Sequence, residues 1–207
     1  MGLNDLSQNI YVLNLEERLD RKEHILKELN KINCVDYTLV KSVNGHIINN
    51  PTRLKNGMFG LVSTYLNIYE EWKTKKTGTI TIIEDDCVFV DNFNEEMKVY
   101  IENVPSDWEM IYFGGNHNHH YGTTTQVINP YCLKLSYTFT AHCIILKDHV
   151  FEHLISDIKN FTLENDVTLA NFQKVYNAYC PVKVLANQIP NFSNIENINV
   201  DYKNLIK

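Results

Sequence analysis

Hydrophobic residues in the first half of the chain follow two spacings, which predict strands and helices in alternation. Short apolar runs predict buried strands at residues 9–15, 36–43 and 79–83. Apolar residues three, four or seven positions apart, with charged residues between them, predict helices at 16–32 and 57–75. The β-branched run TITII at 79–83 is the strongest strand signal in the chain, and it ends abruptly at three carboxylates.

The second half is less regular but continues with both kinds of element. Its pattern predicts helices at about 93–102, 148–158 and 166–179, and strands at 109–113, 141–146 and 182–185. Alternating strands and helices are typical of parallel βαβ units. We therefore predict an α/β fold, one domain over residues 1–207, with a mostly parallel central sheet and helices on both faces.

Composition and charge narrow the class of protein. No apolar run approaches the roughly 20 residues needed to span a bilayer, and the polar N-terminus does not resemble a secretory signal. The net charge of −6 argues against a protein that coats nucleic acid. The five cysteines are odd in number and include no C-x-x-C pair, which predicts free buried thiols in a reducing compartment. We expect a cytoplasmic protein.

The candidate site follows from the topology. In open α/β sheets, ligands bind beyond the carboxyl ends of the strands. Four segments follow predicted strands and are expected to meet at one edge: Asn14, residues 43–45, residues 84–86 and residues 114–116.

The acidic triplet Glu84-Asp85-Asp86 is the most informative of these segments. Three adjacent carboxylates after a buried strand repel one another unless a cation or hydrogen-bond donors compensate. Mg²⁺ and Mn²⁺ bind to carboxylates together with phosphate oxygens and water. The triplet alone is equally compatible with a solvated loop or a helix cap.

An ordered series of motifs resembles glycosyltransferase family 25, which includes lipooligosaccharide and collagen galactosyltransferases. The resemblance covers about residues 9–196. Its blocks are IYVLNL at 10–15 with Arg18, Asp20 and Arg21, SVNG at 42–45, GMFGLVST at 57–64, IIEDD at 82–86, DWEMIYFG at 107–114, TAHCII at 140–145, Asp166, and Gln188 with FSNI at 192–195. Departures from the family pattern are Thr64 for His, Asn44 and Asn194 for Asp, and His142 at an aromatic position.

The resemblance implies a GT-A-type domain that binds a nucleotide sugar at the edge of the sheet. Asp86 is expected to be the direct ligand of Mn²⁺ or Mg²⁺, with Glu84 on the ion or the donor ribose and Asp85 also contacting the donor. The expected donor is UDP-glucose or UDP-galactose. The expected acceptor is a hydroxyl of a glycan or glycoprotein, and the transfer is expected to invert the sugar configuration. The bound ion would offset the charge on the departing diphosphate.

An inverting transfer needs a general base to accept the proton of the acceptor hydroxyl. Asp166 is the candidate base, with Glu164 as the second choice. The alternative is that Asp166 caps a helix that begins near Val167, and both roles are compatible.

Donor contacts are expected from the same edge. Arg18 and Arg21 suit bidentate contact with phosphate, although both also fit a solvated helix face. Asn14 is expected either to bind the base or ribose or to cap the following helix. Val43 and Asn44 lie in the turn that the resemblance places at the nucleotide.

Acceptor contacts are less defined. Gly114 and Gly115 follow a strand and are expected near the acceptor sugar. His142 is either a core histidine or a contact to sugar or metal. His117, His119 and His120 fit a loop at the rim of the site better than a zinc site.

Two other classes of function compete with an enzyme of this family. A non-catalytic module that binds nucleotide sugars or carbohydrate would keep the fold without turnover. A metal-dependent phosphohydrolase would need further His and Asp ligands at recurring spacing, and the sequence does not offer them.

Overall fold

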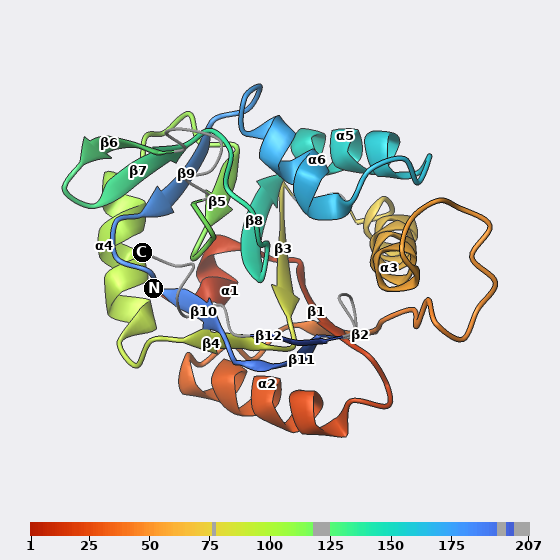
Figure 1. The fold of residues 1–207 in the computed structure, drawn as a ribbon. Coiled ribbons are helices and arrows are strands. Elements are labelled where there is room, and N and C mark those ends of the chain that lie inside the picture. The colour runs from red at the N-terminus through yellow and green to blue at the C-terminus, as the bar shows by residue number, and fades with distance from the viewer. Residues whose placement is uncertain (76–77, 118–124, 194–197, 201–207) are drawn as a thin grey trace.

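An eight-stranded sheet forms the centre of the structure (Figure 1). The computed structural model describes residues 1–75, 78–117, 125–193 and 198–200. The order of the sheet is β2-β1-β3-β8-β5-β9-β7-β6. Its strands are β1 (Ile10–Asn14), β2 (Thr38–Lys41), β3 (Thr79–Glu84), β5 (Met110–Tyr112), β6 (Thr125–Asn129), β7 (Cys132–Leu135), β8 (Cys143–Lys147) and β9 (Ala178–Pro181).

Strand direction confirms the predicted α/β architecture. β1 pairs in parallel with both β2 and β3, and β5 pairs in parallel with β9. β8 runs antiparallel between β3 and β5, and β7 runs antiparallel between β9 and β6. All strands except β7 and β8 therefore run in one direction. The carboxyl ends of β1, β2 and β3 lie at the same edge, where β8 begins.

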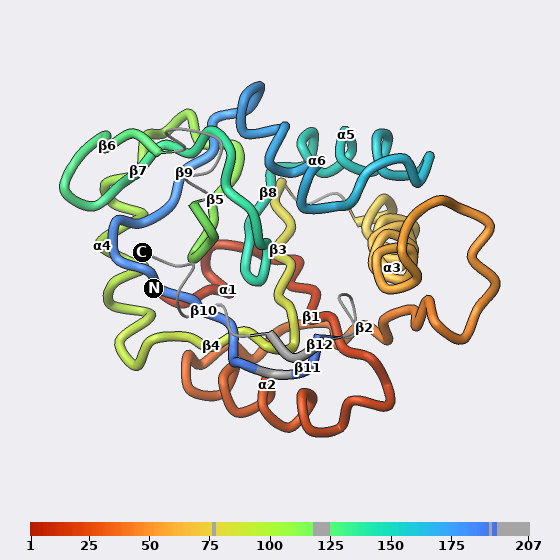
Figure 2. The backbone as a smooth tube through the Cα atoms, viewed as in Figure 1, coloured from red at the N-terminus to blue at the C-terminus, as the bar shows by residue number. Residues whose placement is uncertain are grey.

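Helices cover both faces of this sheet (Figures 1 and 2). Their bounds are α1 (Leu3–Leu6), α2 (Leu19–Lys31), α3 (Asn56–Trp72), α4 (Phe93–Asn103), α5 (Asp148–Ile158) and α6 (Asn165–Phe172). One hydrophobic cluster joins the sheet to α3, α5 and α6, and the other joins it to α1, α2 and α4. Among the described residues, no helix has the length and apolar character needed to cross a membrane.

The central strands are buried on both sides, which explains their continuous apolar sequence. All five residues of β1 are buried. Tyr11 and Leu13 pack in the first cluster, whereas Ile10 and Val12 pack in the second. Because successive side chains of a strand point to opposite faces, one short run serves both cores.

Two small two-stranded sheets accompany the central sheet. Strand β4 (Cys87–Phe89) pairs with β10 (Ala186–Gln188), and β11 (Asn191–Ser193) pairs with β12 (Ile198–Val200). The sequence pattern predicts none of β4, β6 or β7, since each is short or has exposed apolar residues.

The predictions for the C-terminal third need correction. The expected helix 166–179 ends at Phe172, and residues 178–181 form β9 instead. The expected strand 182–185 is a connection between β9 and β10. The predicted helix is therefore too long at its C-terminal end, where pairing of β9 with both β5 and β7 decides the structure.

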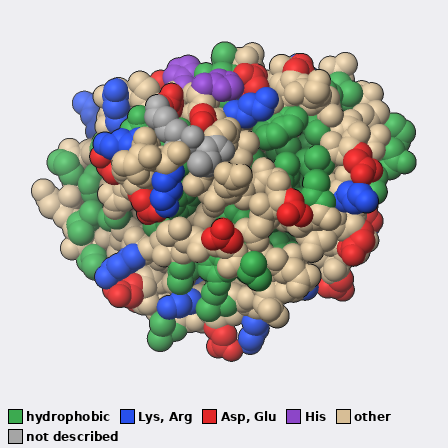
Figure 3. All heavy atoms as spheres, turned by 180° about the vertical axis from the view of Figure 1, so that it is seen from behind, with side chains coloured by type: hydrophobic (Ala, Val, Ile, Leu, Met, Phe, Trp, Pro, Cys, Tyr) green, Lys and Arg blue, Asp and Glu red, His purple; other side chains and the backbone are tan. Residues whose placement is uncertain are grey.

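The five cysteines are free and buried, as predicted. Burial raises the pKa of the Cys34 thiol to about 12 and that of Cys132 to about 11. The pKa values of Cys87 and Cys180 are raised for the same reason. Figure 3 shows the face opposite to that of Figure 1, where acidic and basic side chains are interspersed.

Close backbone contact joins α3 to the turn after β2. A Cβ atom added at Gly60 would lie 2.3 Å from the Val43 carbonyl oxygen and 2.7 Å from the Gly45 nitrogen. A Cβ atom added at Gly45 would lie 1.8 Å from the Asn56 carbonyl oxygen. These two glycines let the helix rest directly on the turn that borders the site.

This contact gives a prediction with a clear sign. Alanine is favoured over glycine in a helix by about 1 kcal/mol. Gly60→Ala is nevertheless expected to lower the free energy of unfolding by about 1–3 kcal/mol, because the added methyl group overlaps rigid backbone. Urea unfolding should measure the loss. Ser63→Ala in the same helix is the control, and a Gly60→Ala protein as stable as the wild type would contradict this packing.

Candidate active site

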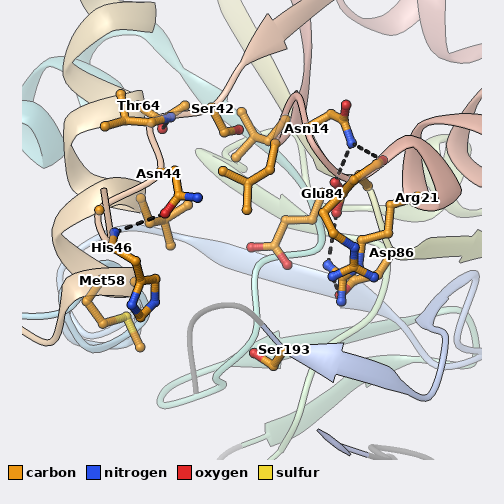
Figure 4. A pocket seen from close by; sticks show the side chains of 18 of the residues that line it. Asn14, Arg21, Ser42, Asn44, His46, Met58, Thr64, Glu84, Asp86 and Ser193 are labelled. Carbon is orange, nitrogen blue, oxygen red and sulfur yellow. Dashed lines mark hydrogen bonds and ion pairs between the residues drawn. The ribbon is translucent and has the colours of Figure 1, made fainter. Parts of the chain in front are cut away.

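A cavity opens where β1, β2 and β3 end, and it collects most of the predicted site residues (Figure 4). Its lining includes Asn14, Arg18, Arg21, Val43, Asn44, Glu84, Asp85, Asp86 and Asp166. These residues come from distant parts of the chain. The parallel strands bring their carboxyl ends to one place, as the topology predicts.

Arg21 is the cation at the centre of the acidic triplet. Its Nη1 atom lies 3.0 Å from Asp85 Oδ1 and 3.2 Å from Asp86 Oδ2. All three residues are buried, with exposed fractions of 9% for Arg21 and 7% for each aspartate. Asn14 Nδ2 also donates to Asp85 Oδ2 at 2.7 Å. Arg21 therefore neutralises part of the triplet from within the protein, instead of lying on a solvated helix face.

Glu84 carries the charge that is least compensated. Burial raises the pKa of this carboxyl well above its usual range, and the nearby charges of Asp86, Asp166 and Asp85 raise it further. The Asp85 pKa is also raised by burial, although Arg21 and Asn14 oppose the rise. The carboxylates that line the cavity, Glu84, Asp85, Asp86 and Asp166, outnumber its two arginines, and a bound cation would reduce their repulsion.

The two arginines also contact the C-terminal segment. Arg18 Nη1 and Arg21 Nη2 lie 3.1 and 3.0 Å from the Phe192 carbonyl oxygen. Arg18 further donates two hydrogen bonds to Asp20, which hold the pKa of that carboxyl well below its usual range. Asn14 donates to the Arg18 carbonyl oxygen at 3.2 Å, so its amide links β1 to the start of α2 and does not cap a helix N–H group.

The opposite end of the cavity is less charged. Asn44, His46 and Met58 lie there, across from Glu84 (Figure 4). Asn44 Oδ1 accepts from the His46 backbone N–H at 2.9 Å, and its amide donates to Glu17. This difference between the two ends suits a ligand with a neutral part and a charged part.

The hydroxyl of Thr64 ties α3 to the turn at this neutral end. It accepts from the Val43 N–H at 2.9 Å and donates to the Gly60 carbonyl oxygen at 2.8 Å. Thr64 thus fixes the turn, where the resembling family has a histidine.

Asp166 faces the triplet from the first turn of α6. The helix begins at Asn165, so Asp166 lies inside it and does not cap it. Burial raises the Asp166 pKa to about 6, a hydrogen bond from the Thr140 backbone lowers it, and the charge of Glu164 raises it. A carboxyl with this pKa is ionised at neutral pH and is still basic enough to accept a proton.

A strained loop holds the backbone donor for Asp166. Thr140 has a φ of 65°, a left-handed conformation that costs a β-branched residue roughly 1–3 kcal/mol. Thr138, two residues before Thr140, is held by the buried side chain of Gln173. This side chain accepts a hydrogen bond from the Thr138 N–H at 2.6 Å and donates one to the Thr138 carbonyl oxygen at 2.8 Å. Both ends of α6 are therefore attached to this loop, which fixes the distance between Thr140 and Asp166.

Three predicted acceptor contacts lie elsewhere. His142 is fully buried, and its Nε2 atom bonds to the Ala186 carbonyl oxygen at 2.9 Å. Gly114 packs against both groups, since a Cβ atom there would lie 1.9 Å from Ala186 O and 2.7 Å from His142 Nε2. Gly115 packs against the Thr138 side chain. These three residues pack against Ala186 and Thr138 and are not among the described residues that line the cavity.

Other histidine and acidic candidates are placed as follows. His117 bonds to Thr138 Oγ1 at 2.8 Å, while His119 and His120 lie outside the described residues. Glu164 precedes α6 and is absent from the described lining of the cavity. Asp166 is therefore the better placed of the two candidate bases.

Sequence reasoning missed several residues that line the cavity, namely Thr140, Gln188, Ser193, His46 and Met58. Gln188 and Ser193 belong to a motif that the family resemblance includes, so that signal was available. Thr140 also belongs to a block of that resemblance, but nothing in the sequence indicates its left-handed backbone, which threonine rarely adopts.

Comparison with known proteins identifies the family of the chain. The profile of "Glycosyltransferase family 25 (LPS biosynthesis protein)" matches residues 7–162. The "Procollagen lysyl hydroxylase and glycosyltransferase" of Acanthamoeba polyphaga mimivirus is 24% identical over 200 aligned positions, and the match covers 80% of this chain and 22% of that protein. The chain thus spans about a fifth of the length of this curated relative.

One solved structure shares the fold. It is a glycosyltransferase involved in the glycosylation of the major capsid of PBCV-1, with a TM-score of 0.53 and 10% identity. The alignment covers 91% of this chain and 95% of that one.

The buried charge of Asp166 predicts a dependence of stability on pH. The native pKa of about 6 exceeds the unfolded value, so ionising Asp166 destabilises the fold as the pH rises from about 4 to 6. Asp166→Asn should therefore stabilise the protein at pH 7 by up to about 3 kcal/mol, and should have little effect at pH 4. Thermal unfolding at both pH values is the measurement.

The control is Asp91→Asn, whose side chain is fully exposed and should show no such difference. An Asp166→Asn protein that is destabilised equally at both pH values would contradict the assignment of a buried, unfavourable charge.

Proposed function

Because the chain belongs to glycosyltransferase family 25, we propose that it transfers a hexose from a UDP-sugar to a hydroxyl of a glycan or glycoprotein, with inversion. One observation carries the proposal: Asp166 and the carboxylates of residues 84–86 line the same cavity. UDP-glucose and UDP-galactose are the proposed donors. The names of the family and of its relatives, which mention lipopolysaccharide and protein, support an acceptor of either kind.

The two ends of the cavity support a nucleotide sugar as the ligand. The neutral end, with Asn44 and Met58, suits a base and ribose. The charged end, with Arg18 and Arg21, suits a diphosphate, because guanidinium groups bind phosphate oxygens with paired hydrogen bonds.

The residues present fit a divalent cation. Glu84 and Asp86 would hold Mn²⁺ or Mg²⁺, both of which prefer oxygen ligands. Two features of the site favour this: burial and the neighbouring carboxylates, which raise the pKa of Glu84, and a buried Gln188 Oε1 atom without a hydrogen-bond partner among the described residues. When bound, the ion offsets negative charge on the departing diphosphate.

The residues of the chain have separate tasks in the transfer. Arg21 holds Asp85 and Asp86 in fixed orientations. Asp166 accepts the proton of the acceptor hydroxyl as its oxygen bonds to the anomeric carbon of the donor. The bond from that carbon to the phosphate oxygen breaks in the same step, and its electron pair leaves with UDP. The Thr140 backbone N–H orients the Asp166 carboxylate for this step.

The proposed function predicts metal-dependent turnover. With Mn²⁺, the protein is expected to release UDP from UDP-glucose or UDP-galactose, slowly onto water, and EDTA should stop the release. Asp86→Ala should lower the rate at least 100-fold, whereas Asp91→Ala, an exposed acid nearby, should leave it unchanged. A luminescent UDP assay measures both. Calorimetric binding of UDP-sugar without any product over hours would favour the non-catalytic module instead.

The role proposed for Asp166 predicts how the rate depends on pH. If Asp166 is the base, kcat/KM should fall about tenfold per pH unit below pH 6, because the protonated carboxyl cannot accept a proton. Asp166→Asn should lose at least 100-fold in kcat and keep the affinity for UDP. A pH profile of the wild type that is flat from 5 to 8 would contradict this role.

A further inference from the structure

Gln188 lies beside the acidic triplet because of strand pairing. β10 pairs antiparallel with β4, and Gln188 is opposite Cys87 in that register. The next residue donates its backbone N–H to the Asp86 carbonyl oxygen, with Ile189 N 2.9 Å away. Backbone pairing at Asp86 and Cys87 thus holds the Gln188 backbone beside the end of the triplet.

The side-chain amide touches two carboxylates at once. Gln188 Nε2 lies 3.3 Å from Glu84 Oε2 and 3.3 Å from Asp86 Oδ1. Its Oε1 atom is buried and has no hydrogen-bond partner among the described residues. A buried amide oxygen without a partner costs roughly 1–3 kcal/mol, so a role for this atom needs to be found.

The spacing of these three groups matches a shared cation. Neighbouring ligands on an octahedral ion with bonds of about 2.1 Å lie roughly 3 Å apart. The Gln188 amide nitrogen lies 3.3 Å from one oxygen of Glu84 and 3.3 Å from one oxygen of Asp86, close to this separation. Rotation of the amide about its last side-chain bond exchanges Nε2 with Oε1, and amide oxygens are ligands that hard cations accept.

We propose that Gln188 is the third protein ligand of the divalent cation, together with Glu84 and Asp86. The proposal rests on the function proposed above. In the absence of the ion, the NH₂ group of Gln188 faces the two carboxylates and donates to them. With the ion bound, the amide turns so that Oε1 faces the metal.

The charge of the site favours an amide at this position. The described residues contain no group of three His, Cys, Asp or Glu side chains arranged to hold a metal ion. Four carboxylates already line the cavity, namely Glu84, Asp85, Asp86 and Asp166. A neutral oxygen completes the set without further repulsion.

Arg21 orients the carboxylates of the proposed metal site. Its Nη1 atom binds Asp86 Oδ2, and the other oxygen of that carboxylate, Oδ1, faces Gln188. Arg21 also holds Asp85, which leaves Glu84 and Asp86 as the ligands nearest to the amide. Such orienting contacts commonly change metal affinity 10- to 100-fold.

The test measures Mn²⁺ binding to the full chain by electron paramagnetic resonance, in which the signal of the free ion decreases as the ion binds. The titration is done with Mn²⁺ alone and again in the presence of UDP. Gln188→Ala is expected to weaken binding at least tenfold. Gln188→Glu keeps an oxygen at this position and should lose far less Mn²⁺ affinity than Gln188→Ala. Asn187→Ala, the neighbouring residue on β10, is the control and should bind as the wild type does.

The outcomes separate this inference from the proposed function. If Asp86→Ala weakens binding and Gln188→Ala does not, Gln188 is not a ligand, although the metal site stands. If the wild type binds no Mn²⁺ under either condition, both the metal site and the ligand assignment are wrong. Thermal unfolding of each variant identifies loss of fold, and tight binding by Gln188→Glu beside weak binding by Gln188→Ala supports the proposal without relying on activity.

Discussion

The ion pair between Arg21 and the two aspartates at the tip of β3 is the interaction on which the site depends. Burying three charged groups is costly unless each has partners. Asp85 has Arg21 and Asn14, Asp86 has Arg21 and Gln188, and Arg21 also donates to the Phe192 carbonyl oxygen. These contacts connect β1, α2, β3, β10 and β11, so the pair organises elements from both ends of the chain.

Around this pair, the site keeps more negative charge than the protein alone compensates. Glu84 and Asp166 both have raised pKa values, and burial is the first cause in each case. The left-handed Thr140 adds backbone strain beside Asp166. Unfavourable charge and strain of this kind gather at functional sites, because the stable core elsewhere compensates for them. Here the compensation comes from a sheet that is buried on both faces.

The sequence was sufficient where the signal was local and strong. Strands β1 and β3 were predictable from apolar and β-branched runs, and parallel topology then brought Asn14, Val43 and the triplet to one edge. Prediction failed where pairing partners decide the structure. The predicted helix 166–179 runs into β9, which lies between β5 and β7, and the partners of His142 and Gln188 come from segments more than 40 residues away.

The arrangement of the thiols has a practical consequence. Every cysteine of the chain is buried, and burial raises the pKa of four of the five, which slows reaction with thiol reagents. A single cysteine introduced on an exposed helix position is thus the preferred target for a fluorophore or spin label, with no need to remove the native residues first. Distances from such a label to the cavity can then be followed in the otherwise unaltered protein.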